Sequence, residues 1–439
     1  MTRFESRDPD WLAPGDALAR IMAATPRLAS EEVALEAAFG RVLGEDVTAG
    51  ATLPPWDNSA MDGYAVRGAD IDGASEHAPR VLRVVGEVWA GDAADTPEVG
   101  PGEAVRIMTG GPIPGGADSV VRVEHTDAEA GAAGRVAVKD DRDRGRNVRP
   151  AGEDTRTGDV VLAAGAAIGA GQVAALASAG RATVRVAIRP RVAVLCSGDE
   201  LRGADAFEDV VAGRGIPDSN GPMLAAALAG CGAQAVALGV APDREDAVRA
   251  HLERAVAADA LVTVGGASMG EAYLFKRVLD AMGFQLDFWR VRLRPGTPFG
   301  FGHLPRDSGP PLPVFSLPGN PASAFVTFQL LVRPFLMRAA GRSDVHLPSV
   351  QAVAGEPLSG GGRHARAWRV RLAHRSGERI AWLAGPQSSG LVRSLALADA
   401  LVVVPQGREV AEGGGVRALL LDRGPAGAST PPFPHDPPS

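Results

Sequence analysis

The region between residues 191 and 337 alternates short apolar runs with helical patterns, and this alternation limits the possible folds most strongly. The apolar runs lie at 192–195, 235–240, 261–264, 284–293 and 314–317. Helical patterns lie at 222–229, 245–257, 271–282 and 321–337. Buried strands that alternate with helices predict a doubly wound, mostly parallel α/β domain, with a ligand crevice at the carboxyl ends of its strands.

Three of these strands are followed by glycine-rich turns. The turns are Ser197-Gly198-Asp199-Glu200, Gly265-Gly266-Ala267-Ser268-Met269-Gly270 and Pro318-Gly319-Asn320-Pro321. Glycines let backbone N–H groups approach an anion, and a helix that begins at Pro321 with Asn320 as its cap adds a positive dipole end. One such turn alone is more simply explained as a tight connection. Three turns at one sheet edge predict a site for a small phosphorylated ligand.

Arginines at alternate positions of one predicted strand indicate an oxyanion site. Arg290, Arg292 and Arg294 should share one face of that strand. Guanidinium groups match phosphate or a tetrahedral oxyanion such as molybdate or sulfate. A solvated edge strand with protective charges explains the same spacing equally well. That simpler explanation is stronger for a second basic group, which comprises Arg363, Arg366, Arg369 and Arg371.

Carboxylates are candidates for holding Mg²⁺ beside a phosphate, and the acidic candidates are Asp62, Asp154, Glu200 and Asp243. Spacing alone does not show that Asp62 reaches the crevice, but two of the others could face it. Glu200 directly follows a strand, and Asp243 lies near the start of a helix. Carboxylates suit Mg²⁺, which neutralises charge on a transferring phosphoryl group. Asp243 could equally cap the helix. No Ser-His-Asp or Cys-His arrangement indicates a protein nucleophile. Water activated near the metal is therefore the expected attacker on a phosphoanhydride.

The rest of the chain has different patterns. Residues 14–39 predict two helices, the second capped by Ser30 and ended by Gly40. Short alternating runs from 41 to 143 predict a β-rich insert, after which a strand and a helix at 160–180 return to the first domain. Beyond residue 341, alternation without a helical signal predicts a small barrel-like β domain. The expected domains are an N-terminal mixed domain (1–46 plus 146–188), the insert (47–145), the α/β domain (189–340), the C-terminal β domain (341–422) and a disordered tail (423–439).

Composition argues against several classes of protein. The net charge of −7 gives no overall basic field for nucleic acid or anionic lipid. Only two cysteines occur, Cys196 and Cys231, so a disulfide framework is not expected. The uncharged run at 160–180 is rich in Ala and Gly rather than Leu, which argues against a membrane span. Without a secretion signal at the N-terminus, a cytoplasmic location is expected.

The segment Asp57-Asn58-Ser59-Ala60-Met61-Asp62-Gly63-Tyr64-Ala65 resembles the signature of the molybdopterin molybdenumtransferases, the family that includes the E domain of gephyrin. Further stretches agree in order, at 106–110 with 115–118, 152–154, 197–201, 265–268 and 317–321. The resemblance runs from about residue 14 to residue 421. It implies an elongated four-domain protomer and a homodimer whose active site lies between the α/β domain of one subunit and the insert of the other.

The resemblance also implies an activity and a set of site residues. The family inserts molybdenum from molybdate into adenylylated molybdopterin and releases AMP with the help of Mg²⁺; molybdopterin adenylyltransferase and cofactor-receiving enzymes are the expected partners. By position, the implied catalytic residues are Asp62, Thr109, Asp154, Glu200, Asp243 and Ser268, with Glu200 and Asp243 at the metal. The implied ligand-binding residues are Gly265, Gly266, Ser268, Arg290, Arg294, Pro295, Gly296, Pro318, Gly319, Asn320, Arg369 and Ser389. Among these, Arg294, Pro295, Arg369 and Ser389 would hold molybdate.

Three departures from the family pattern leave alternatives open. Tyr273 stands where the family commonly has an acidic residue, and Thr297 stands where a lysine is frequent. Arg290 and Arg294 replace common lysines, and the two side chains are not interchangeable at a tight oxyanion site. A catalytically weak paralogue that binds or carries the pterin nucleotide is one alternative. A tungstate-using variant is another, and a scaffold, as gephyrin also provides, is a third with little support.

Overall fold

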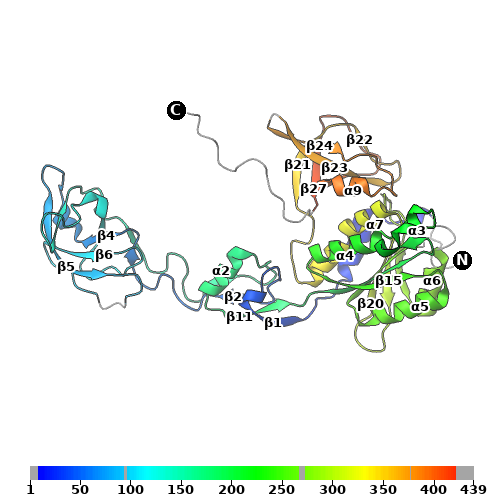
Figure 1. The fold of residues 1–439 in the computed structure, drawn as a ribbon, viewed down its shortest axis with the longest axis horizontal. Coiled ribbons are helices and arrows are strands. Elements are labelled where there is room, and N and C mark those ends of the chain that lie inside the picture. Colours follow the sequence, from blue (N-terminus) through cyan, green and yellow to red (C-terminus); the bar gives the residue numbers. More distant parts are fainter. Residues whose placement is uncertain (1–7, 93–95, 266–271, 376, 422–439) are drawn as a thin grey trace.

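The protein is elongated (Figure 1). The computed structural model describes residues 8–92, 96–265, 272–375 and 377–421. A β-rich insert forms one end, a small mixed unit lies in the middle, and the α/β domain and the C-terminal β domain lie together at the other end. Within the described residues, no helix has the length and apolar character that crossing a membrane requires.

The α/β domain is built on a six-stranded sheet. In spatial order the strands are β15 (Gln234–Ala241), β12 (Arg191–Ser197), β16 (Ala260–Val264), β20 (Leu312–Leu317), β19 (Gly300–Leu304) and β17 (Gln285–Trp289). The first four are parallel, and β19 is antiparallel to both of its neighbours, β20 and β17, so β19 alone among these six strands runs in the opposite direction. The prediction of a mostly parallel sheet is confirmed. The sequence did not predict β19, because its glycines at 300 and 302 are unfavourable in strands.

Helices cover both faces of this sheet and bury a separate core on each. Val192, Val194 and Cys196 face one core with α4 (Asn220–Gly230). The alternate residues, Ala193 and Leu195, face the other core. That second core is closed by α5 (Glu245–Arg254) and α6 (Ala272–Ala281). The period-2 alternation of buried side chains therefore makes β12 a doubly covered central strand.

The long helix predicted after Pro321 is divided. It consists of α7 (Pro321–Thr327), a π-helical turn (Phe328–Val332) and α8 (Arg333–Ala339). Pro334 in the first turn of α8 has no N–H to donate to the preceding turn. A π-helical turn is a common way to accommodate such a break in the hydrogen-bond ladder.

The strand predicted at 284–293 is also divided, and the expectation that its three arginines share a face is wrong. Strand β17 ends at Trp289, and Arg290 has a positive φ of 74°. The chain then leaves the α/β sheet, and β18 (Leu293–Arg294) pairs with β23 (Ala365–Arg375) of the C-terminal domain. This change of partner, which local sequence does not encode, separates the arginines.

Residues 14–39, all of which the structure describes, contain one α-helix and not two. Helix α1 (Pro14–Ala23) forms as predicted, but Ser30–Ala34 is the strand β1, so the predicted helix capped by Ser30 is wrong. Strand β1 pairs with β11 (Thr183–Ala187), and β2 (Val47–Thr48) pairs with β10 (Val160–Leu162), beside α2 (Ala170–Ser178). Pairing with a partner about 150 residues later overrides the local helical pattern.

The insert contains a five-stranded sheet with a buried core. Its spatial order is β7 (Ser119–Arg122), β4 (Gly63–Val66), β6 (Glu103–Ile107), β5 (Arg80–Val88) and β8 (Arg135–Val138). A smaller pair, β3 (Asn58–Ser59) and β9 (Val148–Arg149), lies where the chain enters and leaves. Tyr64 and Val66 of β4 are fully buried. The prediction of a β-rich segment is confirmed.

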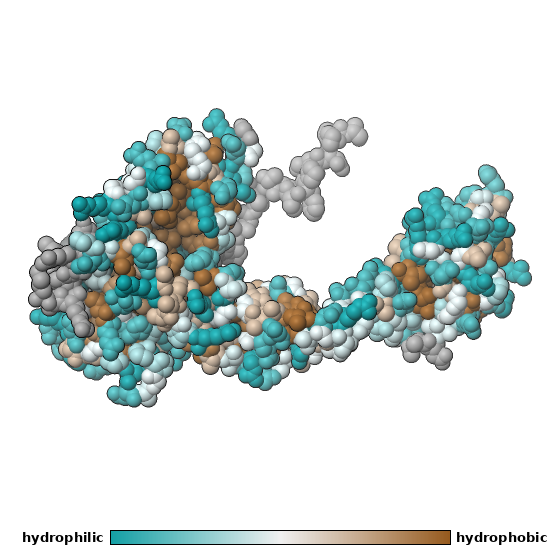
Figure 2. Space-filling model, turned by 180° about the vertical axis from the view of Figure 1, so that it is seen from behind, coloured by the Kyte–Doolittle hydropathy of each residue, from teal (hydrophilic) through white to brown (hydrophobic). Residues whose placement is uncertain are grey.

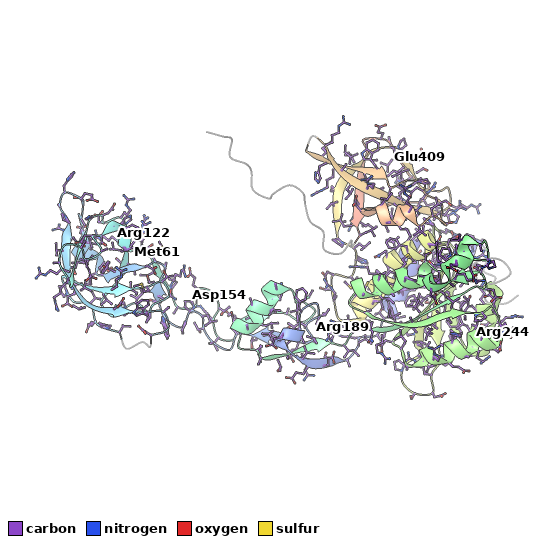
Figure 3. All side chains as sticks on the ribbon, in the orientation of Figure 1. Met61, Arg122, Asp154, Arg189, Arg244 and Glu409 are labelled. Carbon is purple, nitrogen blue, oxygen red and sulfur yellow. The ribbon has the colours of Figure 1, made fainter. Side chains whose placement is uncertain are left out.

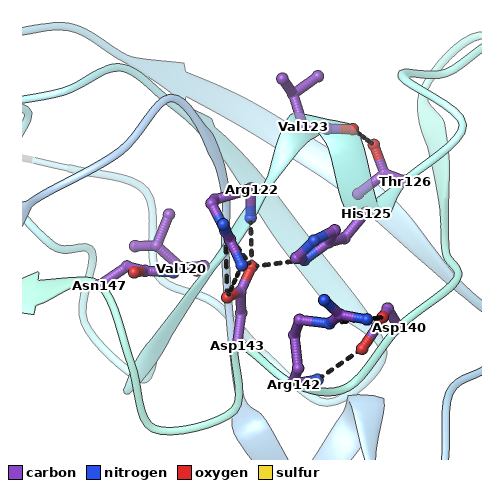
Figure 4. A network of polar contacts seen from close by, with 9 residues as sticks. All are labelled: Val120, Arg122, Val123, His125, Thr126, Asp140, Arg142, Asp143 and Asn147. Carbon is purple, nitrogen blue, oxygen red and sulfur yellow. Dashed lines mark hydrogen bonds and ion pairs between the residues drawn. The ribbon is translucent and has the colours of Figure 1, made fainter. Parts of the chain in front are cut away.

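A buried carboxylate, Asp143, ties β7 to the return segment of the insert (Figure 4). It accepts hydrogen bonds from the backbone N–H and the guanidinium of Arg122, and it lies 2.9 Å from Nδ1 of His125. Burial, the largest single cause, would raise the pKa of Asp143, but the hydrogen bonds from Arg122, Asn147 and His125 together outweigh it and lower the pKa to about 2. Val123, next to Arg122, donates its N–H to the Asp62 carbonyl, so the network supports the segment that carries Asp62.

Replacing Asp143 by Asn is expected to destabilise the insert at neutral pH by about 2 kcal/mol, because the shift from 3.8 to about 2 is lost. A carboxyl group whose pKa is lowered by folding stabilises the folded state at pH values above its pKa in the unfolded chain. That stabilisation is lost as the pH falls through its pKa in the folded protein. The difference between variant and wild type should therefore shrink between pH 4 and pH 2. Calorimetry of the full chain across this range measures it, with Asp140→Asn as a control, since the Asp140 pair with Arg142 is more exposed. Equal destabilisation by both variants would contradict the assignment.

The C-terminal domain is a closed five-stranded barrel. Strand β23 pairs with β24 (Glu378–Leu383), and the ring continues through β21 (Ser349–Ala354), β27 (Gly415–Leu420) and β25 (Ala400–Val404), which returns to β23. This confirms the barrel-like prediction. The short helix α9 (Arg393–Leu397) was not predicted. The remaining small elements are α3 (Phe207–Val211), β13 (Leu201–Arg202), β14 (Ile216–Pro217), β22 (Leu358–Ser359) and β26 (Glu409–Val410).

Candidate active site

A cavity of about 1040 Å³ opens where the α/β domain meets the barrel. It lies at the carboxyl ends of β12, β16 and β20, where the topology of a doubly wound sheet places ligands. All three predicted turns contribute to its wall. The contributing turn residues are Ser197, Glu200, Gly265, Pro318, Gly319 and Asn320.

Gly265 fits a position that no other residue occupies easily. Its φ is +125°, and a Cβ there would lie 2.7 Å from the Ser197 carbonyl oxygen. The backbone of β16 can therefore approach the turn after β12 only because residue 265 lacks a side chain. Gly265 and Ser197 both line the cavity, so this close approach brings the two turns together in its wall.

Replacing Gly265 by alanine is expected to lower the free energy of unfolding by about 1–3 kcal/mol, the usual cost of a strained backbone. Urea unfolding measures this loss. Gly319→Ala is a matched control in the same cavity, because a Cβ at 319 meets its nearest neighbour, the Gly265 Cα, at an ordinary 3.6 Å. The Gly265 variant should unfold at lower urea than the Gly319 variant, and the reverse order would refute the steric argument.

Of the two predicted metal ligands, Glu200 lines the cavity and Asp243 does not. Asp243 and Asp199 exchange hydrogen bonds. The Asp199 N–H donates to Asp243 Oδ2 at 3.3 Å, and the Asp243 N–H donates to Asp199 Oδ1 at 3.1 Å. Arg244, not Asp243, is the N-cap of α5. Asp243 thus braces the turn that carries Glu200.

The cavity also contains residues that sequence reasoning missed. Cys196 and Asn220 line it, and Asn220 donates Nδ2–H to the Gly319 carbonyl at 2.7 Å. The buried Oδ1 of Asn220 has no partner among the described residues. Burial, and then the nearby Asp218 carboxylate, raise the pKa of Cys196 to about 12, so its thiol stays protonated and is not a nucleophile. The Asp-Ser-Asn-Gly run at 218–221, a helix-start pattern after a strand, was the signal that could have located Asn220.

One wall of the cavity comes from the segment after β18. Arg294, Pro295, Gly296 and Thr297 all line it. The peptide bond between Arg294 and Pro295 is cis, and Thr297 Oγ1–H donates to the Leu293 carbonyl at 2.9 Å.

The other two arginines of that group lie elsewhere. Neither Arg290 nor Arg292 lines the cavity. The Arg290 guanidinium carbon lies 5.1 Å from the ring centroid of Trp11. Arg292 donates to the Pro9 carbonyl at 3.4 Å. Both arginines hold the N-terminal segment.

The opposite wall comes from the barrel domain. Arg366, Gln387 and Ser389 line the cavity there, and Asn320 Nδ2–H donates to Ser389 Oγ at 3.1 Å, which joins the two domains. Arg369 is fully buried beneath this wall rather than part of its lining. The second basic group is therefore not simply an exposed strand.

Arg369 supports the loop that carries Ser389. Its guanidinium donates to Ser394 Oγ at 2.9 Å and to the Ser388 carbonyl at 3.2 Å. Its backbone N–H donates to Gln387 Oε1 at 3.0 Å. The buried Nη1 has no hydrogen-bond partner among the described residues. Burial, and then the charge of Arg366, lower the pKa of Arg369.

The three predicted residues of the insert side are far from this cavity within one chain. Figure 3 marks Met61, the neighbour of Asp62, at the insert end, and Asp154 between the insert and the middle unit, both remote from Arg244 in the α/β domain. Asp62 and Thr109 do lie together, because the Thr109 N–H and Oγ1–H both donate to Asp62 Oδ1 at 2.7 Å. These hydrogen bonds lower the pKa of Asp62, so it is ionised at neutral pH.

Two predicted site residues, Gly266 and Ser268, lie outside the described residues, and so does the side chain of Tyr273. Of Tyr273, the structure describes the backbone, in the first turn of α6.

Comparison with known families accounts for nearly all of the folded chain. Residues 12–180 match the MoeA N-terminal region (domains I and II), residues 193–338 match a probable molybdopterin binding domain, and residues 351–421 match the MoeA C-terminal region (domain IV). The chain belongs to the molybdopterin molybdenumtransferase family. It is 38% identical over 380 residues to molybdopterin molybdenumtransferase 2 of Mycobacterium tuberculosis, which spans 85% of this chain and 90% of that protein. It is 33% identical to the molybdopterin molybdenumtransferase of Bacillus subtilis, over 92% of each chain.

Solved structures of the molybdopterin molybdenumtransferase family share the fold. The molybdopterin biosynthesis moeA protein of Pyrococcus horikoshii OT3 superposes with a TM-score of 0.79 at 28% identity, over 94% of this chain and 100% of that one. A second structure of a moeA protein from the same species gives a TM-score of 0.74 at 30% identity, over 93% and 99%. As a member of this transferase family, the protein has a role in molybdenum cofactor biosynthesis.

Proposed function

We propose that this protein transfers molybdenum from molybdate into adenylylated molybdopterin and releases AMP. The observation that carries the proposal is the cavity itself, which joins phosphate-type turns on the α/β side to a wall of arginines. Its volume, about 1040 Å³, suits a nucleotide-sized ligand. Family membership supplies the reaction type.

The turns after β16 and β20 are proposed to hold the pterin nucleotide. Gly265, Pro318 and Gly319 expose backbone there without side-chain bulk, as phosphate binding requires. Asn220 adds an unpaired buried acceptor, Oδ1, which suits an amino or ring N–H donor of a pterin. Molybdate is proposed to lie at Arg294, Pro295 and Ser389, with Arg369 behind Ser389.

The fit of the site to Mg²⁺ rests on Glu200. Among the described residues no three acidic, His or Cys side chains gather as a metal site. Mg²⁺ commonly takes only one or two protein carboxylates and completes its shell with phosphate and water. Glu200, with Asp243 bracing its turn, therefore fits an ion that arrives with the nucleotide. When bound, Mg²⁺ would neutralise charge on the phosphoanhydride.

The protein's own contribution is position and charge. The turns fix the nucleotide, and the arginines hold the oxyanion, so that a bimolecular encounter becomes an oriented one. Because the Cys196 thiol stays protonated, water is the proposed attacker on the phosphoanhydride. The water oxygen bonds to the adenylyl phosphorus, the anhydride P–O bond breaks, AMP leaves and the pterin keeps its own phosphate.

We further propose a homodimer in which Asp62, Thr109 and Asp154 of one subunit complete the cavity of the other. Asp62 is ionised and held by Thr109, yet it is remote from the cavity of its own chain. Apolar surface at the cavity end of the molecule supports a partner there (Figure 2). Exposed large apolar residues of this end include Phe207, Val211, Ile216, Leu391 and Val392.

The proposed reaction indicates which enzymes act before and after this protein. The adenylylated substrate would come from molybdopterin adenylyltransferase, and the product would pass to cofactor-receiving enzymes. A cytoplasmic location is proposed on the same grounds.

The test is AMP release by the purified protein from adenylylated molybdopterin, with molybdate and Mg²⁺ present. Molybdate-dependent release is expected, and no release would refute the proposal. Tungstate in place of molybdate, and the two in competition, distinguish the tungstate alternative. Binding of the nucleotide without any release would favour the carrier alternative that Tyr273 raises.

A further inference from the structure

Arg366 faces Arg294 across two neighbouring strands, and both side chains line the cavity. Strand β18 pairs with β23 in parallel, and the register places Arg294 directly opposite Arg366. Like charges directly opposite each other destabilise a strand pair. Within the described part of the chain, neither guanidinium forms an ion pair with a carboxylate. Water screens part of this repulsion, since Arg294 is exposed, and an anion between the two guanidinium groups would neutralise it.

The side chain of Arg366 is held beside the cavity by a contact with an aromatic ring. Its guanidinium carbon lies 3.8 Å from the ring centroid of Trp368. Trp368 is buried in the barrel, and its Nε1–H donates to the Ser359 carbonyl at 3.0 Å, so the ring is fixed. A cation stacked on a fixed aromatic ring loses less side-chain freedom when it binds an anion.

A further positively charged side chain lies behind the barrel wall of the cavity. Arg369, three residues along β23, is fully buried and has an unpaired Nη1. Burial, and then Arg294, lower the pKa of Arg366, and Arg366 acts on Arg369 in the same direction. Arg294 thus acts on Arg366 and Arg366 acts on Arg369, and none of the three forms a salt bridge with a carboxylate of the described residues. Thr297, on the same wall, contributes no charge and bonds to the backbone.

We propose that Arg366 is a binding residue for a doubly charged tetrahedral oxyanion, which it clamps from the barrel side while Arg294 clamps it from the α/β side. The identity of the anion as molybdate rests on the proposed function. Arg366 was not among the residues implied by the family resemblance. One anion between the two strands would neutralise the facing charges and hold the two domains together at the site.

The test measures binding of the oxyanion alone, without turnover. Isothermal titration calorimetry with molybdate, and separately with sulfate and phosphate, is applied to the full-length wild type and to Arg366→Ala, Arg366→Lys and Arg371→Ala. Arg371 is the matched control, because it is exposed on the same strand and does not line the cavity. AMP binding is measured for each variant, and thermal unfolding confirms that each variant is folded.

The expected result is that Arg366→Ala weakens molybdate binding about 10- to 100-fold, the usual effect of losing charge-assisted hydrogen bonds. Arg366→Lys should recover part of the affinity, while Arg371→Ala should bind like the wild type. AMP binding should change in none of them. If Arg366→Ala and Arg371→Ala bind molybdate equally well, the inference is overturned and the proposed function stands.

Two other outcomes separate the inference from the proposed function. Binding of sulfate or phosphate but not molybdate, weakened only by Arg366→Ala, would support the oxyanion clamp and refute the proposed substrate. Binding of none of the three anions by the wild type would overturn both.

Discussion

Replacing Arg294 by alanine is expected to lower molybdate-dependent AMP release by at least about 100-fold. Arg294 lines the cavity beside Pro295, at the wall where the oxyanion is proposed to lie. A guanidinium can give an oxyanion two parallel charge-assisted hydrogen bonds, each worth about 1.5–3 kcal/mol, and alanine removes both. The rate of Arg294→Lys should lie between those of the wild type and the alanine variant, because lysine keeps the charge but cannot form the paired hydrogen bonds. The measurement is the rate of AMP release at saturating adenylylated molybdopterin, over a range of molybdate concentrations.

Arg292→Ala is the control for this loss. It removes an arginine two residues away that contacts the Pro9 carbonyl and does not line the cavity. Its rate should stay within a few-fold of the wild type. If both variants lose activity equally, the effect is structural, and Arg294 has no special role in binding the anion.

The parts of the site that the sequence predicted are those with local causes. The turns after β12, β16 and β20 depend on glycine and proline at fixed places, and the alternation of strands and helices brings them to one sheet edge. Gly265 illustrates this, since its positive φ and its approach to Ser197 are satisfied only by glycine. Glu200 was predicted for the same reason, because it is the last residue of the turn after β12.

The parts that the sequence did not predict depend on partners far along the chain. Arg290, Arg292 and Arg294 follow a period of two, but the chain changes from one sheet to another between them, so only Arg294 reaches the cavity. Arg366 looked like a residue of an exposed strand because nothing local shows that its strand faces the α/β domain. Ser30–Ala34 is a strand only because β11 pairs with it.

Mixing two inactive variants is expected to restore activity, if the active site is shared between subunits. Asp62→Ala removes the carboxylate that Thr109 holds in the insert, and Arg294→Ala removes the cation in the α/β cavity. Each variant alone should be nearly inactive. After subunit exchange of an equal mixture, about half of the dimers are heterodimers, and each has one site with both residues intact. About one quarter of the wild-type activity should return.

The recovered fraction distinguishes two arrangements of the site. If Asp62 and Arg294 serve the same chain, no heterodimer contains an intact site, and the mixture stays inactive. A control mixture of Glu200→Gln with Arg294→Ala should also stay inactive, because both residues line the cavity of one chain and a heterodimer then carries one defect in each site. Recovery only in the mixture that pairs an insert variant with a cavity variant would mean that Asp62, the neighbour of Met61 at the insert end of Figure 3, reaches the cavity of the partner subunit.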